Sequence, residues 1–176
     1  LIKGQTAFIS GASSGIGKAC AHHFAALGAN LVITARRMDR LKELSKELSA
    51  AYGVNVTPFQ LDVQNFGEIE KVYQQLIENK INIDILVNNA GLALAADKLH
   101  EGKIENWDTM IDTNIKGLLY VTRTILPSMV KRDSGHIINI GSIAGHGCYP
   151  NGNVYCATKF AVKAISRSLR LDLIGT

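Results

Sequence analysis

The sequence predicts an α/β protein built on a parallel, doubly wound sheet, and two observations support this prediction. Short apolar segments of strand length alternate with longer amphipathic segments along the whole chain. The apolar segments carry almost no charge, as expected of strands that helices cover on both faces. Strands that alternate with helices form parallel sheets with right-handed crossovers. We therefore expect three layers, with the sheet in the middle.

Length and composition set the broad class of the protein. The 176 residues suffice for one domain with a substantial core. The formal net charge is +4 and the basic residues form no runs, so a nucleic-acid partner is not indicated. No apolar run reaches the length of a membrane span, and no membrane partner is expected. The three cysteines show neither a disulfide framework nor metal-ligand spacing, which indicates a cytoplasmic location and no metal.

The first expected strand, Thr6–Ser10, leads into a glycine-rich turn. Gly11, Gly15 and Gly17 are spaced G-x-x-x-G-x-G, and a helix then runs to Leu27. Glycines between a strand and a helix let the backbone approach a pyrophosphate, which the helix N-terminus stabilises. Such turns also connect strands to helices without any ligand, but the position of this one favours a dinucleotide site.

The end of the second expected strand, Asn30–Ala35, predicts the cofactor. NAD-binding units carry an acidic residue about 20 positions after the glycine turn, whereas this strand ends in Arg36 and Arg37. Two guanidinium groups suit the 2′-phosphate of NADP, so NADP is the expected cofactor and NAD the less favoured one. Alternatively, the arginines merely begin the next helix, Met38–Ala51, whose leucines form an apolar stripe.

Two further strands also end in polar residues. The third, Val54–Leu61, is followed by Asp62, which suits either an adenine amino group or the cap of the next helix, Phe66–Asn79. The fourth, Ile83–Val87, ends in the motif NNAG at positions 88–91. The small residues of this motif leave room for a flat ring system. An ordinary polar turn is the alternative.

A long helix is expected over Asn106–Arg132. Apolar residues recur along it at three- and four-residue spacing, and Asn114 interrupts this stripe. A buried amide needs hydrogen-bond partners, so Asn114 either binds a carbonyl across a helix kink or holds a water or a ligand. Pro127 lacks an amide hydrogen and crowds the carbonyl of Arg123, which predicts a bend between these two residues.

The fifth expected strand, His136–Ile140, precedes the segment predicted to carry the chemistry. Ser142 lies at the carboxyl end of that strand, where open α/β sheets bind ligands, and its hydroxyl can bond a substrate oxygen. Tyr155 and Lys159 are one turn apart on a helix that Asn153 is expected to cap. An ammonium beside a phenol favours the phenolate, which can exchange a proton near neutral pH. The alternative is a tyrosine packed on a lysine stem.

Together these motifs resemble the short-chain dehydrogenase/reductase family over essentially the whole chain. The resemblance rests on five motifs in order: the turn at residues 10–17, Asp62, the motif at 88–91, Asn114, and Ser142 with the sequence YCATK at 155–159. Ser10 stands where the family usually has Thr, a change that keeps the hydroxyl. The resemblance implies a Rossmann-like fold, an oxidoreductase acting on a small alcohol or ketone, and a homodimer or homotetramer.

The resemblance also implies roles for the matching residues. Tyr155 is the expected general acid/base, and Lys159 favours its phenolate and binds the nicotinamide ribose. Ser142 is expected to orient the substrate oxygen, and Asn114 to hold a water in a proton relay to Lys159. The expected cofactor contacts are Gly11, Ser13, Ser14, Gly15, Ile16, Gly17, Arg36, Arg37, Asp62, Val63, Asn88, Ala90, Gly91, Tyr155 and Lys159.

More narrowly, the segments ARR, IDILVNNAGLAL, DTNIKGL, HIINIGSIAG and GNVYCATKFAV resemble the branch that oxidises serine and other 3-hydroxy acids, including 3-hydroxypropionate, with NADP. The alternatives are a 3-oxoacyl-thioester reductase of the same family and a non-catalytic dinucleotide-binding protein. The family's fold continues after the catalytic helix with two strands and a substrate lid. We therefore expect residues 1–176 to be part of a single domain of about 250 residues, truncated after that helix.

Overall fold

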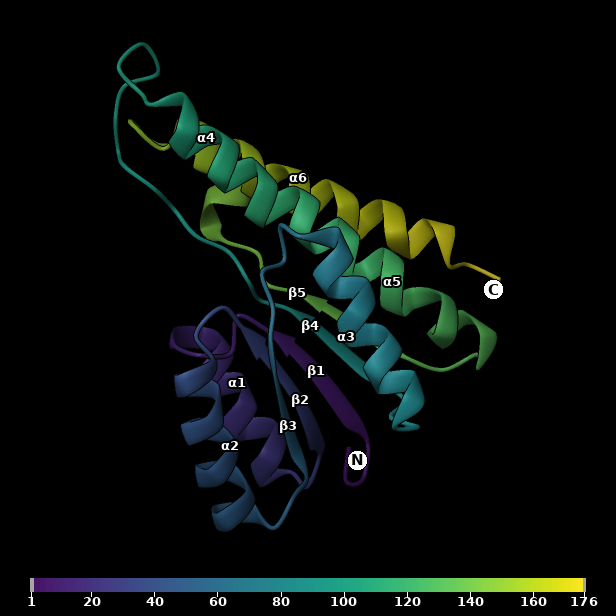
Figure 1. Cartoon of the computed structure of the whole chain (residues 1–176). Helices are drawn as coiled ribbons and strands as arrows, with labels where there is room; N and C mark the ends of the chain where they lie inside the picture. The colour runs from purple at the N-terminus through teal and green to yellow at the C-terminus, as the bar shows by residue number, and fades with distance from the viewer. Residues whose placement is uncertain (1, 176) are drawn as a thin grey trace.

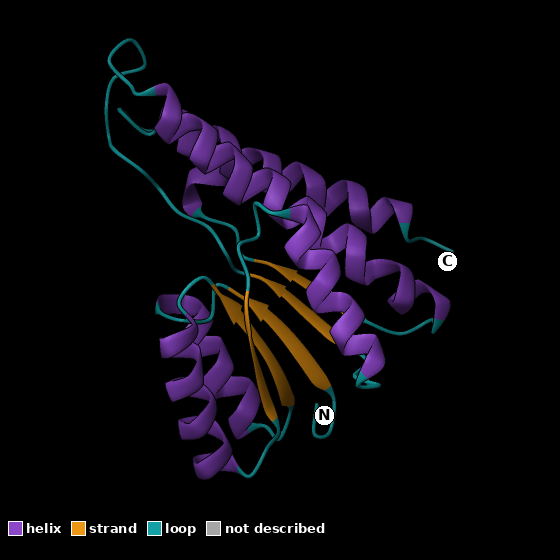
Figure 2. Ribbon diagram, viewed as in Figure 1, coloured by secondary structure: helices purple, strands orange, loops and turns teal. Residues whose placement is uncertain are grey.

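A five-stranded parallel sheet forms the middle layer of the computed structural model, which describes residues 2–175 (Figure 2). The strands are β1 (Thr6–Ser10), β2 (Asn30–Ala35), β3 (Val56–Gln60), β4 (Ile85–Asn88) and β5 (His136–Asn139). Their order across the sheet is β3-β2-β1-β4-β5, with every neighbouring pair parallel. This confirms the predicted parallel, doubly wound sheet. The direction in which strands are added reverses between β1 and β4, and this position is called the switch point of the sheet.

Helices cover both faces of the sheet. They are α1 (Gly15–Ala26), α2 (Met38–Tyr52), α3 (Phe66–Glu78), α4 (Ile104–Ile111), α5 (Leu118–Lys131) and α6 (Asn153–Asp172). Figure 1 shows α1 and α2 on one side of the sheet and α3, α5 and α6 on the other. In the same view α4 and α5 run alongside α6 and extend beyond the sheet.

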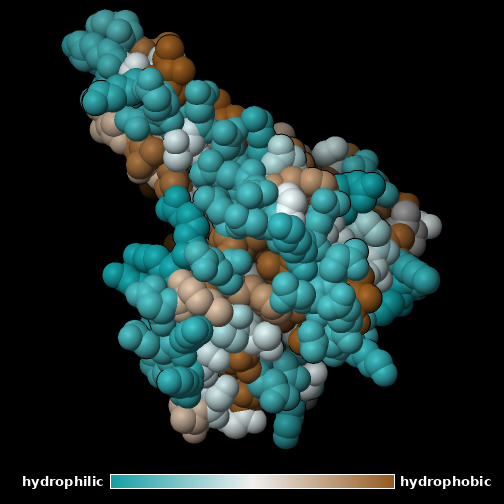
Figure 3. All heavy atoms as spheres, in the orientation of Figure 1, coloured by the Kyte–Doolittle hydropathy of each residue, from teal (hydrophilic) through white to brown (hydrophobic). Residues whose placement is uncertain are grey.

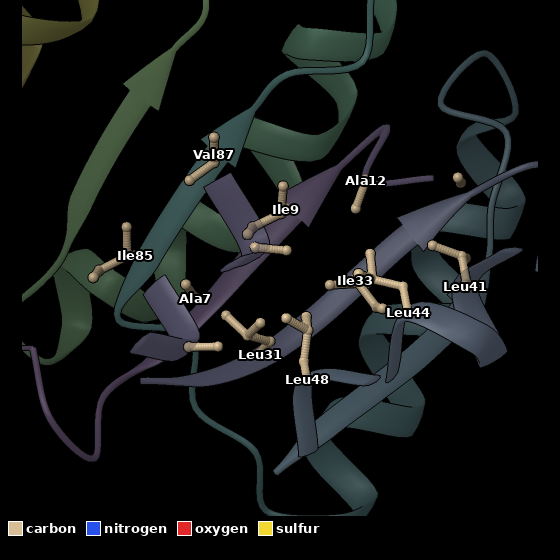
Figure 4. Packing of buried hydrophobic residues seen from close by; sticks show 13 residues of the cluster. Ala7, Ile9, Ala12, Leu31, Ile33, Leu41, Leu44, Leu48, Ile85 and Val87 are labelled. Carbon is tan, nitrogen blue, oxygen red and sulfur yellow. The ribbon is translucent and has the colours of Figure 1, made fainter. Parts of the chain in front are cut away.

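Alternate residues of the strands pack into two hydrophobic cores, one on each face of the sheet. On the α1–α2 side, Ile9 and Ile33 pack with the leucine stripe of α2, which includes Leu44 (Figure 4). On the opposite side, Phe8 and Val32 pack with apolar residues of α3 and α5. Because successive strand residues point to opposite faces of a sheet, the continuous apolar strands of this chain supply both cores.

The long helix predicted over Asn106–Arg132 is interrupted. A π-helical stretch, η1 (Asp112–Gly117), separates α4 from α5 and contains Asn114. Such stretches are rare and often occur at functional sites. The α5 helix continues through Pro127, and the π-helical stretch lies around Asn114. The bend expected between Arg123 and Pro127 stays a prediction.

Two helix caps differ from those considered in the sequence. Asn65, not Asp62, caps α3, because its Oδ1 accepts a hydrogen bond from the amide three residues later at 3.2 Å. The cap alternative for Asp62 is therefore wrong. At α6 the cap position belongs to Gly152, and Asn153 is the first helical residue, with its Oδ1 accepting from the next amide at 2.7 Å. In both helices the residue at the cap position therefore differs from the one considered in the sequence, although α3 begins at Phe66 as predicted.

The face of the molecule in Figure 3 is largely hydrophilic where helices cover it. Hydrophobic atoms show through along its middle. Between residues 2 and 175, no helix combines the length and the apolar character that a membrane span requires.

Candidate active site and cofactor cleft

Close packing holds the glycine-rich turn between β1 and α1. Gly11 has a φ of +67°, and a Cβ atom there would lie 2.9 Å from the Cα atom of Ala90. A Cβ atom at Gly17 would lie 2.4 Å from Nδ2 of Asn89 and 2.5 Å from the Gly11 carbonyl oxygen. Nδ2 of Asn89 donates to the carbonyl oxygens of Ser10 and Gly11 at 2.9 and 3.1 Å. The helix α1 therefore begins directly at the ends of the strands, where its unpaired amides suit an anion.

The hydroxyl of Ser10 ties this turn to β4. Its Oγ accepts hydrogen bonds from the amides of Asn89 and Ala90, both at 3.0 Å. The same hydroxyl lies 3.4 Å from the carbonyl oxygen of Val87, to which it donates. Ser10 is buried, so the hydroxyl that this chain shares with the family's usual Thr has a structural role.

The two arginines after β2 differ in their contacts. One guanidinium nitrogen of Arg37 donates to Oγ of Ser13 at 2.9 Å and to Oγ of Ser14 at 3.0 Å. Within the described part of the chain, Arg36 makes no comparable bond to the turn, although both arginines border the same cleft. Arg37 and the two serines form a corner rich in hydrogen-bond donors, which suits a phosphate group.

A cleft of about 610 Å³ runs along the carboxyl ends of the strands, from the arginines to α6. Open α/β sheets bind dinucleotides at this position, beside the switch point. Most of the predicted site residues line it: Gly11, Ser13, Ser14, Gly15, Ile16, Arg36, Arg37, Asp62, Val63, Ala90, Gly91, Tyr155 and Lys159. The lining does not include Gly17, Asn88, Asn114 or Ser142.

Several lining residues were not predicted from the sequence. Gln64 and Thr113 both border the cleft, and Nε2 of Gln64 donates to Oγ1 of Thr113 at 2.9 Å, which joins the end of β3 to η1. The others are Ala35, Leu61, Asn89, Leu92, Ala93, Ile140 and Gly141. Each lies within a few residues of a predicted position. All except Thr113, which lies in η1, are at or just after the end of a strand, and strand ends line the site in such sheets.

Tyr155 and Lys159 lie on the first two turns of α6, and both border the cleft as predicted. The Nζ atom of Lys159 is 6.0 Å from the centre of the Tyr155 ring and donates to the carbonyl oxygen of Ile140 at 2.9 Å. Burial lowers the pKa of Lys159 below its usual value of 10.5. The lysine is thus buried, and the Ile140 carbonyl holds its ammonium group near the phenol ring.

Asn114 is buried, and both the oxygen and the nitrogen of its side-chain amide make hydrogen bonds. Oδ1 accepts from the Leu92 amide at 2.9 Å, and Nδ2 donates to the Leu92 carbonyl oxygen at 2.8 Å. Nδ2 also donates to Oγ1 of Thr158 at 3.1 Å. Asn114 therefore joins the loop after β4 to the helix that carries Lys159. It does bind a carbonyl, as one interpretation held, but that carbonyl belongs to a different segment.

Ser142 and Asn88 lie outside the cleft. The Ser142 hydroxyl accepts from the amide of Ala144 at 3.1 Å, at the start of the 3₁₀ turn η2 (Ile143–Gly145). Asn88 is buried, and its Nδ2 donates to Oγ1 of Thr122 and Oδ1 of Asn139 at 2.8 and 2.9 Å. The contacts of Asn88 join β4 to α5 and β5 inside the protein.

The parallel sheet, the glycine turn at its switch point and the tyrosine–lysine pair on α6 define a Rossmann-like domain of the dehydrogenase type. The family model for short chain dehydrogenases matches residues 5–176, and the chain belongs to that family.

Particular relatives are similar over almost the whole chain. The NADP-dependent 3-hydroxy acid dehydrogenase YdfG of Escherichia coli O157:H7 is 51% identical over 168 residues, which are 96% of this chain and 66% of that protein. A sulfoacetaldehyde reductase of Chromohalobacter salexigens is 44% identical over 170 residues, with the same two coverages. The closed form of serine dehydrogenase complexed with NADP+ has a TM-score of 0.93 at 49% identity, covering 98% of this chain and 68% of that one. The chain thus spans 66% of the length of these two sequence relatives.

Proposed function

We propose that the protein is an NADP-dependent oxidoreductase that transfers a hydride between nicotinamide and a small 3-hydroxy acid, such as serine or 3-hydroxypropionate. The observation that carries this proposal is a single cleft with two distinct ends. One end has Arg37 across two serine hydroxyls, and the other has Tyr155 beside the buried Lys159. Relatives named as NADP-dependent 3-hydroxy acid dehydrogenases support the substrate class.

The residues present fit the dinucleotide. Neighbouring atoms lie so close to Gly11 and Gly17 that neither position has room for a side chain. A turn that binds a pyrophosphate requires this close packing. The arginine corner would hold the 2′-phosphate, Asp62 the adenine amino group, and Lys159 the nicotinamide ribose. When bound, NADP supplies the hydride acceptor.

Tyr155 is the proposed general acid/base. In the direction of oxidation its phenolate takes the proton of the substrate hydroxyl, and in reduction the phenol returns it. Lys159 stabilises the phenolate through its positive charge, because its Nζ is held near the ring by the Ile140 carbonyl. Ser142 accepts a bond from the Ala144 amide, which leaves its own hydroxyl proton able to reach a substrate oxygen. Asn114 is proposed to hold a water in a relay to Lys159 through Oδ1, which has a second lone pair, since both hydrogens of Nδ2 are bonded to Leu92 and Thr158.

The remaining assignments concern the whole protein. Residues 1–176 are proposed to be the dinucleotide-binding part of one domain that continues into further strands and a substrate lid, since the chain spans 66% of its relatives. A homodimer or homotetramer is supported by exposed apolar side chains on α4, α5 and α6, namely Ile111, Leu119 and Phe160. A cytoplasmic location is supported by three free cysteines.

Turnover assays test the proposed function. Serine, 3-hydroxypropionate and a 3-oxoacyl thioester are offered to the full-length protein, each with the NADP and the NAD cofactor. The proposal expects kcat/KM for the hydroxy acids to be at least about tenfold higher with NADP than with NAD. Turnover of the thioester alone would instead indicate an acyl-thioester reductase. NADPH binding without turnover of any substrate would indicate a non-catalytic dinucleotide-binding protein.

A further inference from the structure

A second, smaller pocket meets the cofactor cleft at Tyr155. It has a volume of about 170 Å³, and Ala93 and Tyr155 line both spaces. This volume is well above the roughly 10–15 Å³ that a single water needs, so the pocket has room for one small organic acid. Its walls are the loop 93–97, the beginning of α4 and the loop 149–153. In Figure 1 the loops that precede α4 and α6 lie at the same end of the helix pair, beyond the sheet.

The loop on one side of this pocket is fixed at both of its ends. The amide of Leu94 lies 3.4 Å from Sδ of Met110, to which it donates. The carbonyl oxygen of Asp97 accepts from Nδ2 of Asn153 at 2.9 Å, which ties the loop to the start of the catalytic helix. Because Tyr155 follows two residues later on that helix, the position of Asp97 is set relative to the proposed general acid/base. The pocket is therefore formed before any ligand enters.

The backbone of the pocket is also strained. Ala95 and Asn151 have φ values of +56° and +64°, although neither is glycine, and both line the pocket. Non-glycine residues held in this region cost free energy and gather at ligand sites. The apolar part of the wall comes from Trp107, Met110 and Tyr149.

Two opposite charges border the pocket. Its lining contains one basic side chain, Lys103 at the N-terminus of α4, and one acidic side chain, that of Asp97. Lys103 is exposed and Asp97 is half-buried. Within residues 2–175 neither side chain takes part in an ion pair, either with the other or with a third residue. Both charges are therefore available to a ligand that carries one group of each sign.

We infer that this pocket receives the amino-acid end of a 3-hydroxy-2-amino acid such as serine, with Lys103 binding its carboxylate and Asp97 its ammonium group. The hydroxyl of the substrate then lies toward Tyr155, at the junction with the cofactor cleft. This inference rests on the proposed function, and it adds a choice between two substrates of that class. A hydroxy acid without an amino group, such as 3-hydroxypropionate, uses Lys103 alone, so the carboxylate of Asp97 favours serine.

Steady-state kinetics with two substrates test the inference on the full-length protein, with NADP in excess. Asp97→Asn should raise KM for serine by at least about tenfold and change KM for 3-hydroxypropionate by no more than about twofold. Lys103→Met should raise KM for both substrates by at least about tenfold. The value of kcat should change little, because neither residue contacts the reacting atoms.

Matched controls come from the same segments. Asp108→Asn and Lys98→Met remove exposed charges that do not line the pocket, and neither should change KM for either substrate. NADPH binding by each variant reports that it is folded. An unchanged KM for serine in Asp97→Asn, or equal losses for the two substrates, would overturn the inference while the proposed function stands. A native protein that binds NADPH but turns over neither substrate would overturn the proposed function, and the inference with it.

Discussion

The two ends of the cofactor cleft are built in different ways. At the end near Arg37, glycines and backbone atoms in close contact shape the turn, and Gly17 has no space for even a methyl group. At the other end, the side chains of Asn114 and Lys159 bind backbone atoms of segments distant in sequence, those of Leu92 and Ile140. The turn at the first end depends on glycines without side chains, whereas the second end depends on particular polar groups. Substitutions at the first end should therefore be harmful through steric clashes, and those at the second end through lost hydrogen bonds.

The largest expected effect separates catalysis from cofactor binding. Tyr155→Phe removes only the hydroxyl of the proposed general acid/base, so kcat should fall by about 10²- to 10⁴-fold. The affinity for NADPH should stay within about twofold of the native value, because the arginine end is untouched. Single-turnover kinetics and NADPH fluorescence measure the two quantities. A variant that retains native turnover would exclude Tyr155 from proton transfer.

A methyl group at the glycine turn should be the most damaging change to stability. In Gly17→Ala the new Cβ meets a backbone carbonyl oxygen at 2.5 Å, which cannot move without shifting the turn. We expect the free energy of unfolding to fall by about 3 kcal/mol in urea denaturation.

Gly147→Ala is the matched control for the glycine turn. A Cβ atom at Gly147 would have no neighbour within 4 Å, and the free energy of unfolding should hardly change. Equal stability losses in the two variants would show that the tight packing at Gly17 is not what holds the turn.

Replacing Asn114 should be costly because it leaves backbone groups without partners. In Asn114→Leu the amide and carbonyl of Leu92 both lose their hydrogen bonds, and unfolding free energy should fall by about 2 kcal/mol. Asn114→Asp keeps an acceptor for the Leu92 amide and should lose less. Thermal and urea denaturation of the two variants provide the comparison, and an Asn114→Leu variant of native stability would contradict it.

The smallest expected effect is a dependence of the free energy of unfolding on pH, caused by Lys159. Because burial lowers its pKa in the folded protein below 10.5, the unfolded chain binds this proton more readily than the folded one does. The contribution of Lys159 to stability is therefore least favourable below its folded pKa and improves as the pH rises toward 10.5.

Lys159→Met lacks this titration, so the native protein should gain unfolding free energy relative to the variant as the pH rises toward 10.5. Urea denaturation across that range measures the difference. A difference that stays constant or shrinks would mean that the ammonium is not destabilised by burial.

Much of the fold was predictable because its signals are local. Strand β2 matched its predicted bounds, since the segment between Gly28 and Arg36 is mostly apolar and carries no charge, which leaves few alternatives. The tyrosine–lysine pair was predictable for the same reason, because one helical turn fixes its spacing. The sequence also showed that Asn114 was out of place in an apolar stripe.

What the sequence did not show depends on tertiary contacts. The π-helical turn around Asn114 exists together with bonds to Leu92 and Thr158, and no local propensity indicates either partner. The choice of Asn65 as the cap of α3 was missed because Asp62, three residues earlier, has an equally suitable side chain. The difference between the two arginines likewise follows from where Ser13 and Ser14 lie in three dimensions.

Fluorescence titration of NADPH and NADH, on the native protein and on Arg36→Gln and Arg37→Gln, tests the central claim most directly. The account predicts tighter binding of NADPH than of NADH by the native protein. Arg37→Gln should weaken NADPH binding by about tenfold, more than Arg36→Gln does, and should leave NADH nearly unchanged. Equal affinity of the native protein for the two cofactors would contradict the account.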